Sequence, residues 1–334
     1  MTESYIDLEK EVWEKSICSG CGACVAVCPA DAIFFPDDSE VPVNCGYCKA
    51  ENDSVPCGAC AAVCPRIHRN IKAGLGEFSK IISARAATEV KKSQSGGAVT
   101  AILANALDEG LIDAVVTITE DPWTLKPESA IITRKDVLIT KAGSRYSWHV
   151  PILESLKEAV INRKIKRIAV VGLPCVISAV RLMKESGNDL LKPFGDSIRL
   201  TIGLFCTESF DYELFVQKIR DKFNLETWQI RRMDIKGHLE ITDLHNSVYK
   251  LEMDDIAGCI RAGCHVCTDF TAVDSDISAG SVGTPDGFTT LLIRNDIGKG
   301  FVDRAVINGV LKAGEADVNN VIIKKLADKK INRS

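Results

Sequence analysis

Apolar and polar positions follow regular periods along most of the chain. Between Ser95 and Glu109 apolar residues recur at i, i+3, i+4 and i+7, which predicts a helix with one buried face, and Gly110 suits the position after its end. Similar patterns predict helices from Pro151 to about Arg163, over Pro174–Glu185 and over Tyr212–Phe223. Short runs of apolar and β-branched residues predict strands at Ile81–Ala87, Ala114–Thr119, Ile131–Arg134, Arg167–Gly172, Ile198–Phe205 and Asp276–Ala279, with a strand-rich stretch over Trp228–Met253.

These elements divide the chain into two parts. From residue 78 onward strands and helices alternate, whereas the first 75 residues carry a dense cysteine pattern instead. We therefore expect an α+β fold with a small N-terminal domain, residues 1–75 (the head), and an α/β domain, residues 78–334 (the body). The junction is expected near Ala73–Phe78, where Gly74 and Gly76 interrupt the pattern.

Composition and charge narrow the classes of protein that fit. Of the 334 residues 46% are hydrophobic and 26% charged, which allows a sizeable core and argues against disorder. The net charge of −4 argues against nucleic-acid binding. Residues 1–72 carry 11 acidic and 6 basic side chains, so the negative charge is concentrated in the head. This asymmetry favours a docking surface for a partner protein on the head.

What the many cysteines indicate depends on the redox compartment of the protein. The segment Met1–Lys15 is acidic and lacks the apolar stretch of a signal peptide. The long uncharged stretch Ile168–Val180 is too short to span a membrane and contains Gly172 and Pro174. We therefore expect no transmembrane segment and a cytoplasmic location. In that reducing compartment the 14 cysteines indicate metal ligation or catalysis rather than disulfides.

The first cysteine run of the head is C-x2-C-x2-C-x3-C-P, formed by Cys18, Cys21, Cys24, Cys28 and Pro29. This run is typical of bacterial ferredoxins that hold two [4Fe–4S] clusters. Its first three cysteines bind one cluster and its fourth binds the other. The head is therefore predicted to be a two-cluster ferredoxin-like domain.

The second run is less regular, because Ser54 stands where the first ligand would be expected. Its cysteines are Cys45, Cys48, Cys57, Cys60 and Cys64. By the crossed pattern, one cluster is assigned to Cys18, Cys21, Cys24 and Cys64. The other cluster is assigned to Cys28 and three of Cys45, Cys48, Cys57 and Cys60, and the sequence leaves open which of the four is spare. A zinc ribbon built from these four is the alternative, although it leaves Cys28 and Cys64 without a role.

Five more cysteines lie in the body. Cys264 and Cys267 form a C-x2-C pair in a glycine-flanked loop, and Cys175 and Cys206 each follow a predicted strand. Because functional sites gather beyond the carboxyl ends of strands in open α/β sheets, these four could hold a third cluster. Cys259 is an alternative fourth ligand. In the competing interpretation Cys175 and Cys206 are small buried apolar residues, and the C-x2-C pair is a redox dithiol.

Three glycine segments are candidate anion sites. Ser95, Gly96 and Gly97 precede a predicted helix, whose first N–H groups would favour a phosphate. The other two are Gly280–Gly283, after a predicted strand, and Ala142–Tyr146, which contains an arginine. Each segment has a simpler explanation as a helix cap or a turn.

Several motifs together resemble the family of coenzyme F420 hydrogenase/dehydrogenase beta subunits. They are SQSGGAVT at 93–100, GLPC at 172–175, IGLFCTESF at 202–210, GCHVCTD at 263–269 and DISAGSVGTPDG at 276–287. The resemblance runs from about Ile81 to Arg294. With its ferredoxin head, the chain looks most like the electron-input subunit of archaeal F420 dehydrogenases that feed a membrane respiratory complex.

The resemblance implies cofactors and residue roles that the spacing alone does not establish. It implies FAD in the body, contacted by Ser95, Gly96, Gly97, Thr100, Ser144, Arg145, Gly280, Ser281, Val282 and Gly283. It implies a body [4Fe–4S] cluster held by Cys175, Cys206, Cys264 and Cys267, with Cys259 spare. The anionic tail of F420 would need Lys or Arg, for which Arg231, Arg232 and Lys236 are candidates.

The resemblance also implies the reaction. The chain would accept a hydride from reduced coenzyme F420 onto FAD and pass single electrons through three [4Fe–4S] clusters. The acceptor would be a partner subunit or a ferredoxin docked near the acidic head, which could bring the chain to a membrane complex as a peripheral subunit. One alternative is an F420-linked subunit of a formate dehydrogenase, hydrogenase or sulfite-reducing complex. Another is a polyferredoxin-like electron carrier without a substrate of its own.

Overall fold

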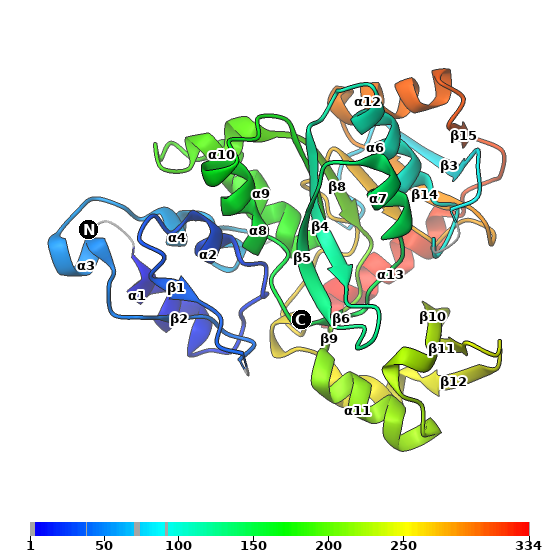
Figure 1. The fold of residues 1–334 in the computed structure, drawn as a ribbon, viewed down its shortest axis with the longest axis horizontal. Coiled ribbons are helices and arrows are strands. Elements are labelled where there is room, and N and C mark those ends of the chain that lie inside the picture. Colours follow the sequence, from blue (N-terminus) through cyan, green and yellow to red (C-terminus); the bar gives the residue numbers. More distant parts are fainter. Residues whose placement is uncertain (1–3, 38, 70–73, 91–92, 334) are drawn as a thin grey trace.

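An eight-stranded sheet forms the centre of the body (Figure 1). The structure, a computed structural model, describes residues 4–37, 39–69, 74–90 and 93–333. In order across the sheet the strands are β15 (Leu311–Ala313), β3 (Lys80–Ala86), β14 (Thr289–Ile293), β13 (Ile277–Gly280), β8 (Ile198–Leu204), β7 (Ile168–Gly172), β4 (Ala114–Glu120) and β5 (Pro127–Ile132). The four strands β13, β8, β7 and β4 are parallel, and the strands on either side are antiparallel to their neighbours.

Helices cover both faces of the sheet because its central strands are apolar on both sides. Every residue of β7 is buried, and alternate residues belong to two separate cores. One core lies under α6 (Ala98–Asp108), α7 (Lys135–Thr140) and α12 (Asp296–Ile307). The other lies under α8 (Glu154–Lys157), the π-helical turn Glu158–Asn162, α9 (Pro174–Glu185) and α10 (Lys192–Ser197).

The head, blue in Figure 1, packs against the second of these cores. Its elements are α1 (Tyr5–Leu8), the π-helical turn Glu9–Trp13, α2 (Ala23–Val27), β1 (Ile33–Phe34), β2 (Val43–Asn44), α3 (Lys49–Asp53), α4 (Ala59–Ala62) and α5 (Pro65–His68). β1 and β2 form an antiparallel pair. Ala26 of α2 and Ala59 of α4 are fully buried in one cluster with Leu153 and Leu156 of the body. The head and the body therefore share a hydrophobic core.

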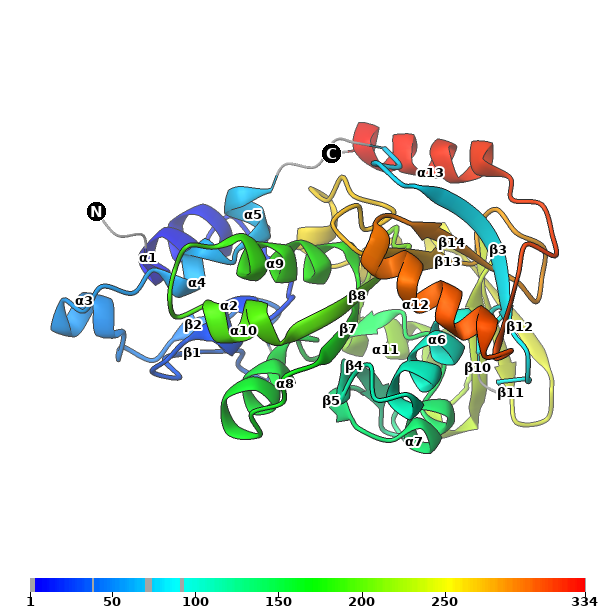
Figure 2. The same cartoon turned by 90° about the horizontal axis from the view of Figure 1, so that it is seen from above.

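A smaller unit lies beside the central sheet, at the lower right of Figure 1. It comprises the parallel pair β6 (Ser147–Trp148) and β9 (Phe210–Asp211), helix α11 (Tyr212–Phe223), and the antiparallel strands β10 (Ile230–Ile235), β11 (His238–Asp243) and β12 (Val248–Glu252). Short 3-10 turns cover Thr227–Gln229, Met253–Cys259 and Ala262–Cys264. The C-terminal helix α13 (Asn320–Arg333) lies along the outside of the body (Figure 2) and buries Ile323 and Ala327 against Phe270.

Most predicted elements are confirmed. The helices over Pro174–Glu185 and Tyr212–Phe223 have the predicted bounds. Several predicted ends are off by one residue, and three predicted elements begin three or more residues from the predicted position. β5 covers Pro127–Ile132 rather than Ile131–Arg134, the helix expected from Ser95 begins at Ala98, and the helix expected from Pro151 begins at Glu154.

The predicted α+β fold with a ferredoxin-like head is confirmed. The expected junction at Ala73–Phe78 includes Ala73, which lies outside the described residues. Gly74 and Gly76 follow it with φ values of +59° and +65°, a backbone that favours glycine. The division into residues 1–75 and 78–334 stays a prediction.

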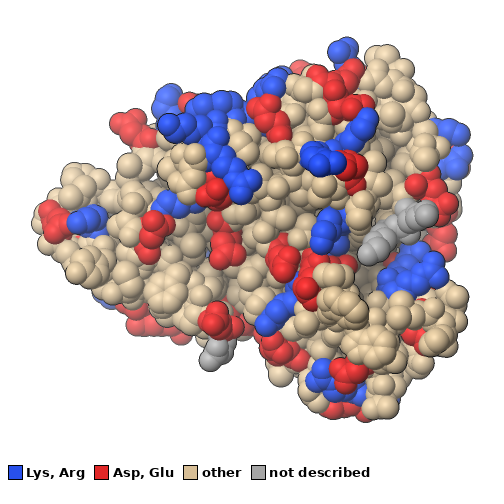
Figure 3. All heavy atoms as spheres, viewed as in Figure 1, with Lys and Arg blue, Asp and Glu red and all other residues tan. Residues whose placement is uncertain are grey.

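The surface shows no simple charge pattern. Over the described residues on the face in Figure 3, acidic and basic side chains are interspersed without an extended area of one sign. Within the same described ranges, no helix combines the length and apolarity needed to cross a bilayer.

Candidate functional site

A cavity of about 580 Å³ opens beyond the carboxyl ends of the parallel strands. Thr117 of β4, Gly172 of β7, Leu204 of β8 and Gly280 of β13 contribute to its wall. The start of α6, the segment Ala142–Trp148 and the end of α13 also contribute to the wall. This is the place where open α/β sheets bind ligands, because the loops that follow parallel strands converge there.

The start of α6 brings three of the predicted cofactor residues to the cavity. Ser95, Gly97 and Thr100 line it, and Gly97 is the N-cap of the helix with a φ of +69°. Gly96 is not among the described lining residues. A β-carbon on Gly96 would lie 2.6 Å from the carbonyl oxygen of Ala84, so this glycine allows the loop to pack on β3.

Some residues of the turn after β13 line the cavity, and others pack behind its wall. Gly280, Ser281 and Val282 line the cavity. A β-carbon on Gly280 would lie 2.2 Å from the ring of Phe205. Gly283 has a φ of +94° and packs against Ile323 instead of lining the cavity. The glycines of this turn are therefore explained by close packing as well as by a ligand.

Ser144 and Arg145 both line the cavity, but the guanidinium of Arg145 already has partners. Its Nε donates to Glu120 Oε2 at 3.2 Å, and its Nη2 donates to the carbonyl oxygen of Lys141 at 2.9 Å. The ion pair with Glu120 neutralises the arginine and fixes the loop that it belongs to. Arg145 is therefore a weaker anion ligand than its sequence context predicts.

The structure brings the four predicted ligands of the body cluster together. The pKa of Cys206 is raised to about 12, mainly by burial and also by the nearby thiols of Cys264 and Cys267, while Lys330 opposes the shift. Burial likewise raises the pKa of Cys175, with contributions from Cys267 and Cys206. Cys206 also lines the cavity. Cys259 is packed in the apolar core of the smaller unit, and the charged groups that affect its pKa are Lys218 and Asp211.

Lys330 of α13 is a site residue that the sequence analysis missed. It is only 4% exposed, lines the cavity, and donates from Nζ to the carbonyl oxygen of Cys206 at 2.6 Å. Burial lowers its pKa, but the thiols of Cys206 and Cys267 outweigh burial, and the net shift is upward. One signal was available, because Ile323, Ala327 and Lys330 share an i, i+4, i+7 face that is otherwise apolar.

The first head set also forms a group. Burial raises the pKa of Cys24 well above its usual range, and the thiols of Cys18, Cys21 and Cys64 raise it further. Burial raises the pKa of Cys64 to about 12, again with contributions from Cys21 and Cys18. The backbone N–H of Gly20 donates to Cys18 Sγ at 3.4 Å, the type of bond that tunes cluster thiolates.

The second head set is grouped around Cys60. The pKa of Cys60 is raised to about 12, mainly by burial and also by the thiols of Cys57, Cys28 and Cys48. Cys45 is exposed to solvent. Of the four cysteines between which the sequence could not choose, Cys45 is thus the one that stands outside the buried group.

Neighbouring sets approach one another at two points. The thiol of Cys21, from the first head set, raises the pKa of Cys175 in the body set. The thiol of Cys60, from the second head set, raises the pKa of Cys24 in the first. The three sets therefore form a continuous series from the cavity into the head.

Four buried thiols suit a [4Fe–4S] cluster, because its iron supplies the positive charge that stabilises thiolates against burial. No group of three or more His, Cys, Asp or Glu within the described ranges converges on a position for a single metal ion. A cubane does not need such convergence, since each of its four irons takes one thiolate.

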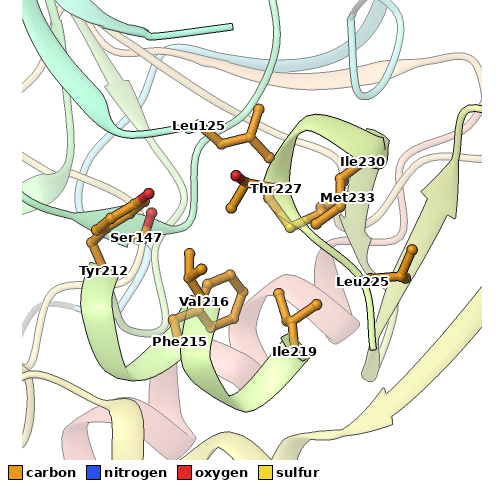
Figure 4. A pocket seen from close by; sticks show the side chains of 10 residues that line it. All are labelled: Leu125, Ser147, Tyr212, Phe215, Val216, Ile219, Leu225, Thr227, Ile230 and Met233. Atoms are coloured by element: carbon orange, nitrogen blue, oxygen red, sulfur yellow. The ribbon is translucent and has the colours of Figure 1, made fainter. Parts of the chain in front are cut away.

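A second pocket lies between α11 and the three-stranded sheet (Figure 4). It is lined by Leu125, Ser147, Tyr212, Phe215, Val216, Ile219, Leu225, Thr227, Ile230 and Met233. Its volume of about 10 Å³ is the space of a single water molecule, so it is a packing gap rather than a substrate site.

Comparison with known families agrees with this arrangement. Residues 81–157 match the N-terminal part, and residues 165–319 the C-terminal part, of the family described as the beta subunit of coenzyme F420 hydrogenase/dehydrogenase. The chain belongs to this family of beta subunits. Residues 11–34 match a "4Fe-4S binding domain". The chain is therefore an iron–sulfur member of a family of F420-linked oxidoreductase subunits.

Relatives cover both parts of the chain. An uncharacterized protein of Methanocaldococcus jannaschii is 44% identical over 100% of this chain and 98% of its own length. A subunit of the F(420)H(2) dehydrogenase of Methanosarcina mazei is 34% identical over 88% of this chain and 83% of its own. A solved chain of the F420-reducing [NiFe] hydrogenase complex from Methanosarcina barkeri is 31% identical, with a TM-score of 0.71 over 78% of this chain and 90% of that one.

Proposed function

We propose that this chain accepts a hydride from reduced coenzyme F420 onto a bound FAD and delivers single electrons through three [4Fe–4S] clusters to a partner protein at the head. The observation that carries the proposal is the position of Cys206. It lines the cavity and belongs to the thiol set of the body, so the predicted flavin site and the predicted cluster site meet at one residue.

The cavity residues fit a flavin dinucleotide. Residues at the start of α6 line a cavity of about 580 Å³, and the free N–H groups of this helix start would hold the pyrophosphate. Apolar side chains such as Val171, Leu204 and Phe205 line the sheet side, where they would exclude water from the ring. When bound, FAD would supply the conversion between a hydride and single electrons. Lys330 would place a positive charge between the cavity and the body cluster.

The cysteine sets would provide the path onward. Cys175, Cys206, Cys264 and Cys267 would hold the body cluster; Cys18, Cys21, Cys24 and Cys64 the first head cluster; and Cys28, Cys48, Cys57 and Cys60 the second. The approach of Cys175 to Cys21 and of Cys24 to Cys60 supports this order.

Electrons would leave from the tip of the head, where α3 lies farthest from the body in Figure 1. Tyr47, beside Cys48, is 72% exposed, and the acidic residues Glu51 and Asp53 of α3 are exposed as well. Lys49 of α3 is paired with Asp53, so the helix has a net charge of −1. A net negative charge beside a near-surface cluster suits a one-electron acceptor with a basic docking face. We propose that such an acceptor is a subunit of the same complex or a ferredoxin-like carrier.

The test is anaerobic stopped-flow absorbance of the protein reconstituted with FAD, iron and sulfide. Reduced F420 should bleach the flavin first and the clusters afterwards, whereas NADH should do neither at comparable speed. NADH is the control because the sequence has no G-x-G-x-x-G unit with a downstream acidic residue. Rapid reduction by NADH without a response to reduced F420 would overturn the assignment. Iron–sulfur protein that binds no flavin would instead favour a polyferredoxin-like carrier.

A further inference from the structure

Two arginines cross the boundary between the head and the body where the first head set meets the body set. Arg66, at the start of α5 in the head, donates from Nε to the carbonyl oxygen of Ile17 at 2.9 Å and from Nη2 to that of Gly263 at 2.6 Å. It thereby joins the backbone before Cys18 to the backbone before Cys264. One guanidinium thus contacts both cysteine loops.

Arg261 makes the reciprocal connection from the body. Its Nη1 donates to the carbonyl oxygen of Ser19 at 2.8 Å, and its Nε donates to Glu40 Oε1 at 3.0 Å. Its Nη2 also donates to the carbonyl oxygen of Glu40, at 2.9 Å. The residue is 2% exposed, so its charge is held inside the protein by one carboxylate and two carbonyl groups.

Trp148 completes the contact. The Arg261 guanidinium lies 3.9 Å from the centre of the Trp148 ring, and Trp148 Nε1 donates to the carbonyl oxygen of Gly20 at 2.9 Å. The carbonyl groups of Ser19 and Gly20, between Cys18 and Cys21, are therefore both bound by body side chains. The two loops also touch directly, since a β-carbon on Gly263 would lie 2.0 Å from the carbonyl oxygen of Cys18.

Both guanidinium groups lie on the backbone that flanks predicted ligands of both sets, through the hydrogen bonds described above. Arg261 is also paired with Glu40, so a neutral residue in its place would leave the Glu40 carboxylate uncompensated. A positive guanidinium at this boundary stabilises negative charge on either side of it. In a chain of buried thiolate-bound clusters, such a charge favours the reduced state of both neighbours.

We propose that Arg66 and Arg261 are positioning residues for electron transfer between the body cluster and the first head cluster. They hold the two cysteine loops in contact, and their fixed charges raise the reduction potentials of both clusters. In the step concerned, the body cluster loses one electron and the head cluster gains it, and no bond forms or breaks. This inference rests on the proposed function, because it assumes electron flow from the body to the head.

The test uses the full, cofactor-loaded protein and the variants Arg66→Gln, Arg261→Gln and Arg261→Lys. Arg163→Gln is the control, because Arg163 is an exposed arginine paired with Glu158. Iron content, anaerobic EPR-monitored redox titration and stopped-flow are measured for each. In both Gln variants the potentials of the body cluster and the first head cluster should become more negative. Reduction of the head clusters, which follows reduction of the flavin, should slow by roughly tenfold, because buried carbonyl groups lose their hydrogen-bond donors.

The Lys variant separates charge from geometry. Arg261→Lys keeps the charge but cannot reach Ser19 and Glu40 together, so its potentials should stay near those of the wild type while transfer slows. Wild-type potentials in both Gln variants with full iron would overturn the proposal. If the Gln variants lose iron, the Lys variant decides instead. Electron transfer at the wild-type rate in Arg261→Lys would then overturn the proposal.

Failure of the proposed function would look different. In that case reduced F420 would leave the flavin of the wild type unreduced, and chemical reduction of the clusters would still test the potentials. Bleaching of the flavin by reduced F420 should be as fast in the arginine variants as in the wild type.

Discussion

At the scale of the residue, the closeness of other buried thiols is what distinguishes the predicted ligand cysteines from Cys259. Burial raises the pKa of seven predicted ligands: Cys18, Cys24, Cys60, Cys64, Cys175, Cys206 and Cys264. A buried thiol is inert as a nucleophile unless a positive charge stabilises its thiolate. Iron provides that charge, so groups of mutually close buried thiols are stable as cluster ligands. Cys259 is also buried, but no thiol is among the groups that shift its pKa.

Replacement of one body ligand should remove one cluster only. Cys264→Ala should lose about four of about twelve iron atoms per chain, because a cubane rarely survives on three thiolates, while the head clusters remain. Cys259→Ala is the matched control and should keep all iron. Iron and acid-labile sulfide are measured on anaerobically prepared protein, and the head clusters are followed by EPR. Equal iron loss in the two variants would contradict the ligand set.

Iron content also decides whether Cys45 or Cys48 is a ligand of the second head cluster. Cys48 is among the thiols that raise the pKa of Cys60, whereas Cys45 is exposed. Cys48→Ala should therefore lose about four iron atoms, and Cys45→Ala should lose none. The loss should come from the second head cluster, and reduction of the body cluster by the flavin should be unaffected. Full iron in Cys48→Ala together with loss in Cys45→Ala would reverse the assignment.

At the scale of the element, the start of α6 links the backbone conformation to cofactor binding. Gly97 adopts a φ of +69° as N-cap, and it lines the cavity together with the residues that follow it. A β-carbon there would lie 3.2 Å from Val90 Cγ2, so a substitution is strained mainly by the left-handed backbone and only secondarily by contact. Gly97 is thus needed for the left-handed backbone conformation at the helix start, and not only for the room that it leaves for a phosphate.

Gly97→Ala should weaken FAD binding by about fivefold, since a β-carbon at positive φ costs ~1 kcal/mol and the strain falls on the binding loop. Gly110→Ala is the matched control. Gly110, after the other end of α6, has a φ of +63° and open space around a β-carbon. It should lower stability to a similar extent and leave FAD affinity unchanged. Flavin fluorescence titration gives the affinity and thermal unfolding the stability. Equal weakening in both variants would mean that helix stability, not the local loop, controls binding.

Sequence reasoning succeeded where a local signal sets an element's end. Pro174 opens α9, and the side chain of Asp211 caps α11 by accepting from the N–H of Leu214. It failed where tertiary contacts decide. β5 is an edge strand that begins at Pro127 and continues with the exposed Glu128 and the half-buried Ser129, so the alternation of apolar and polar residues was weak. The turn before α8 is held to the head, because the N–H of Leu153 donates to the carbonyl oxygen of Cys21.

In the candidate site, too, sequence reasoning found the residues that a local rule places and missed those that only tertiary contacts place. The strand-end rule placed Cys175 and Cys206 together, because parallel strands share one edge. It could not place Lys330, since only folding brings the C-terminal helix to Cys206. Arg66 and Arg261 were missed for the same reason: each is defined by contacts between segments about two hundred residues apart.

At the scale of the whole molecule, the three thiol sets and the cavity form one series that ends at the tip of the head. The shared core of Ala26 and Ala59 with Leu153 and Leu156 holds the head against α8, so the spacing between the sets is part of the fold. The cavity end would take up two electrons at once as a hydride, and the tip would release them singly. Substitutions at the tip should therefore change the release of electrons, whereas substitutions at the cavity should change their uptake.

Charge reversal at the tip should affect the exit of electrons but not their entry. Glu51 lies exposed on α3, close in sequence to Cys48. Glu51→Lys should slow electron delivery to a basic one-electron acceptor such as cytochrome c by roughly two- to fivefold at low ionic strength, because long-range attraction is weakened. The difference should shrink as salt is added. Bleaching of the flavin by reduced F420 should keep its wild-type rate.

Glu128→Lys is the control for this prediction, because it makes the same charge change at an exposed position on β5 of the body. Both variants alter the net charge of the chain equally, so a general electrostatic effect would slow them alike. A local docking surface at the head would slow only Glu51→Lys. Equal rates for Glu51→Lys and the wild type at low salt would place the exit elsewhere.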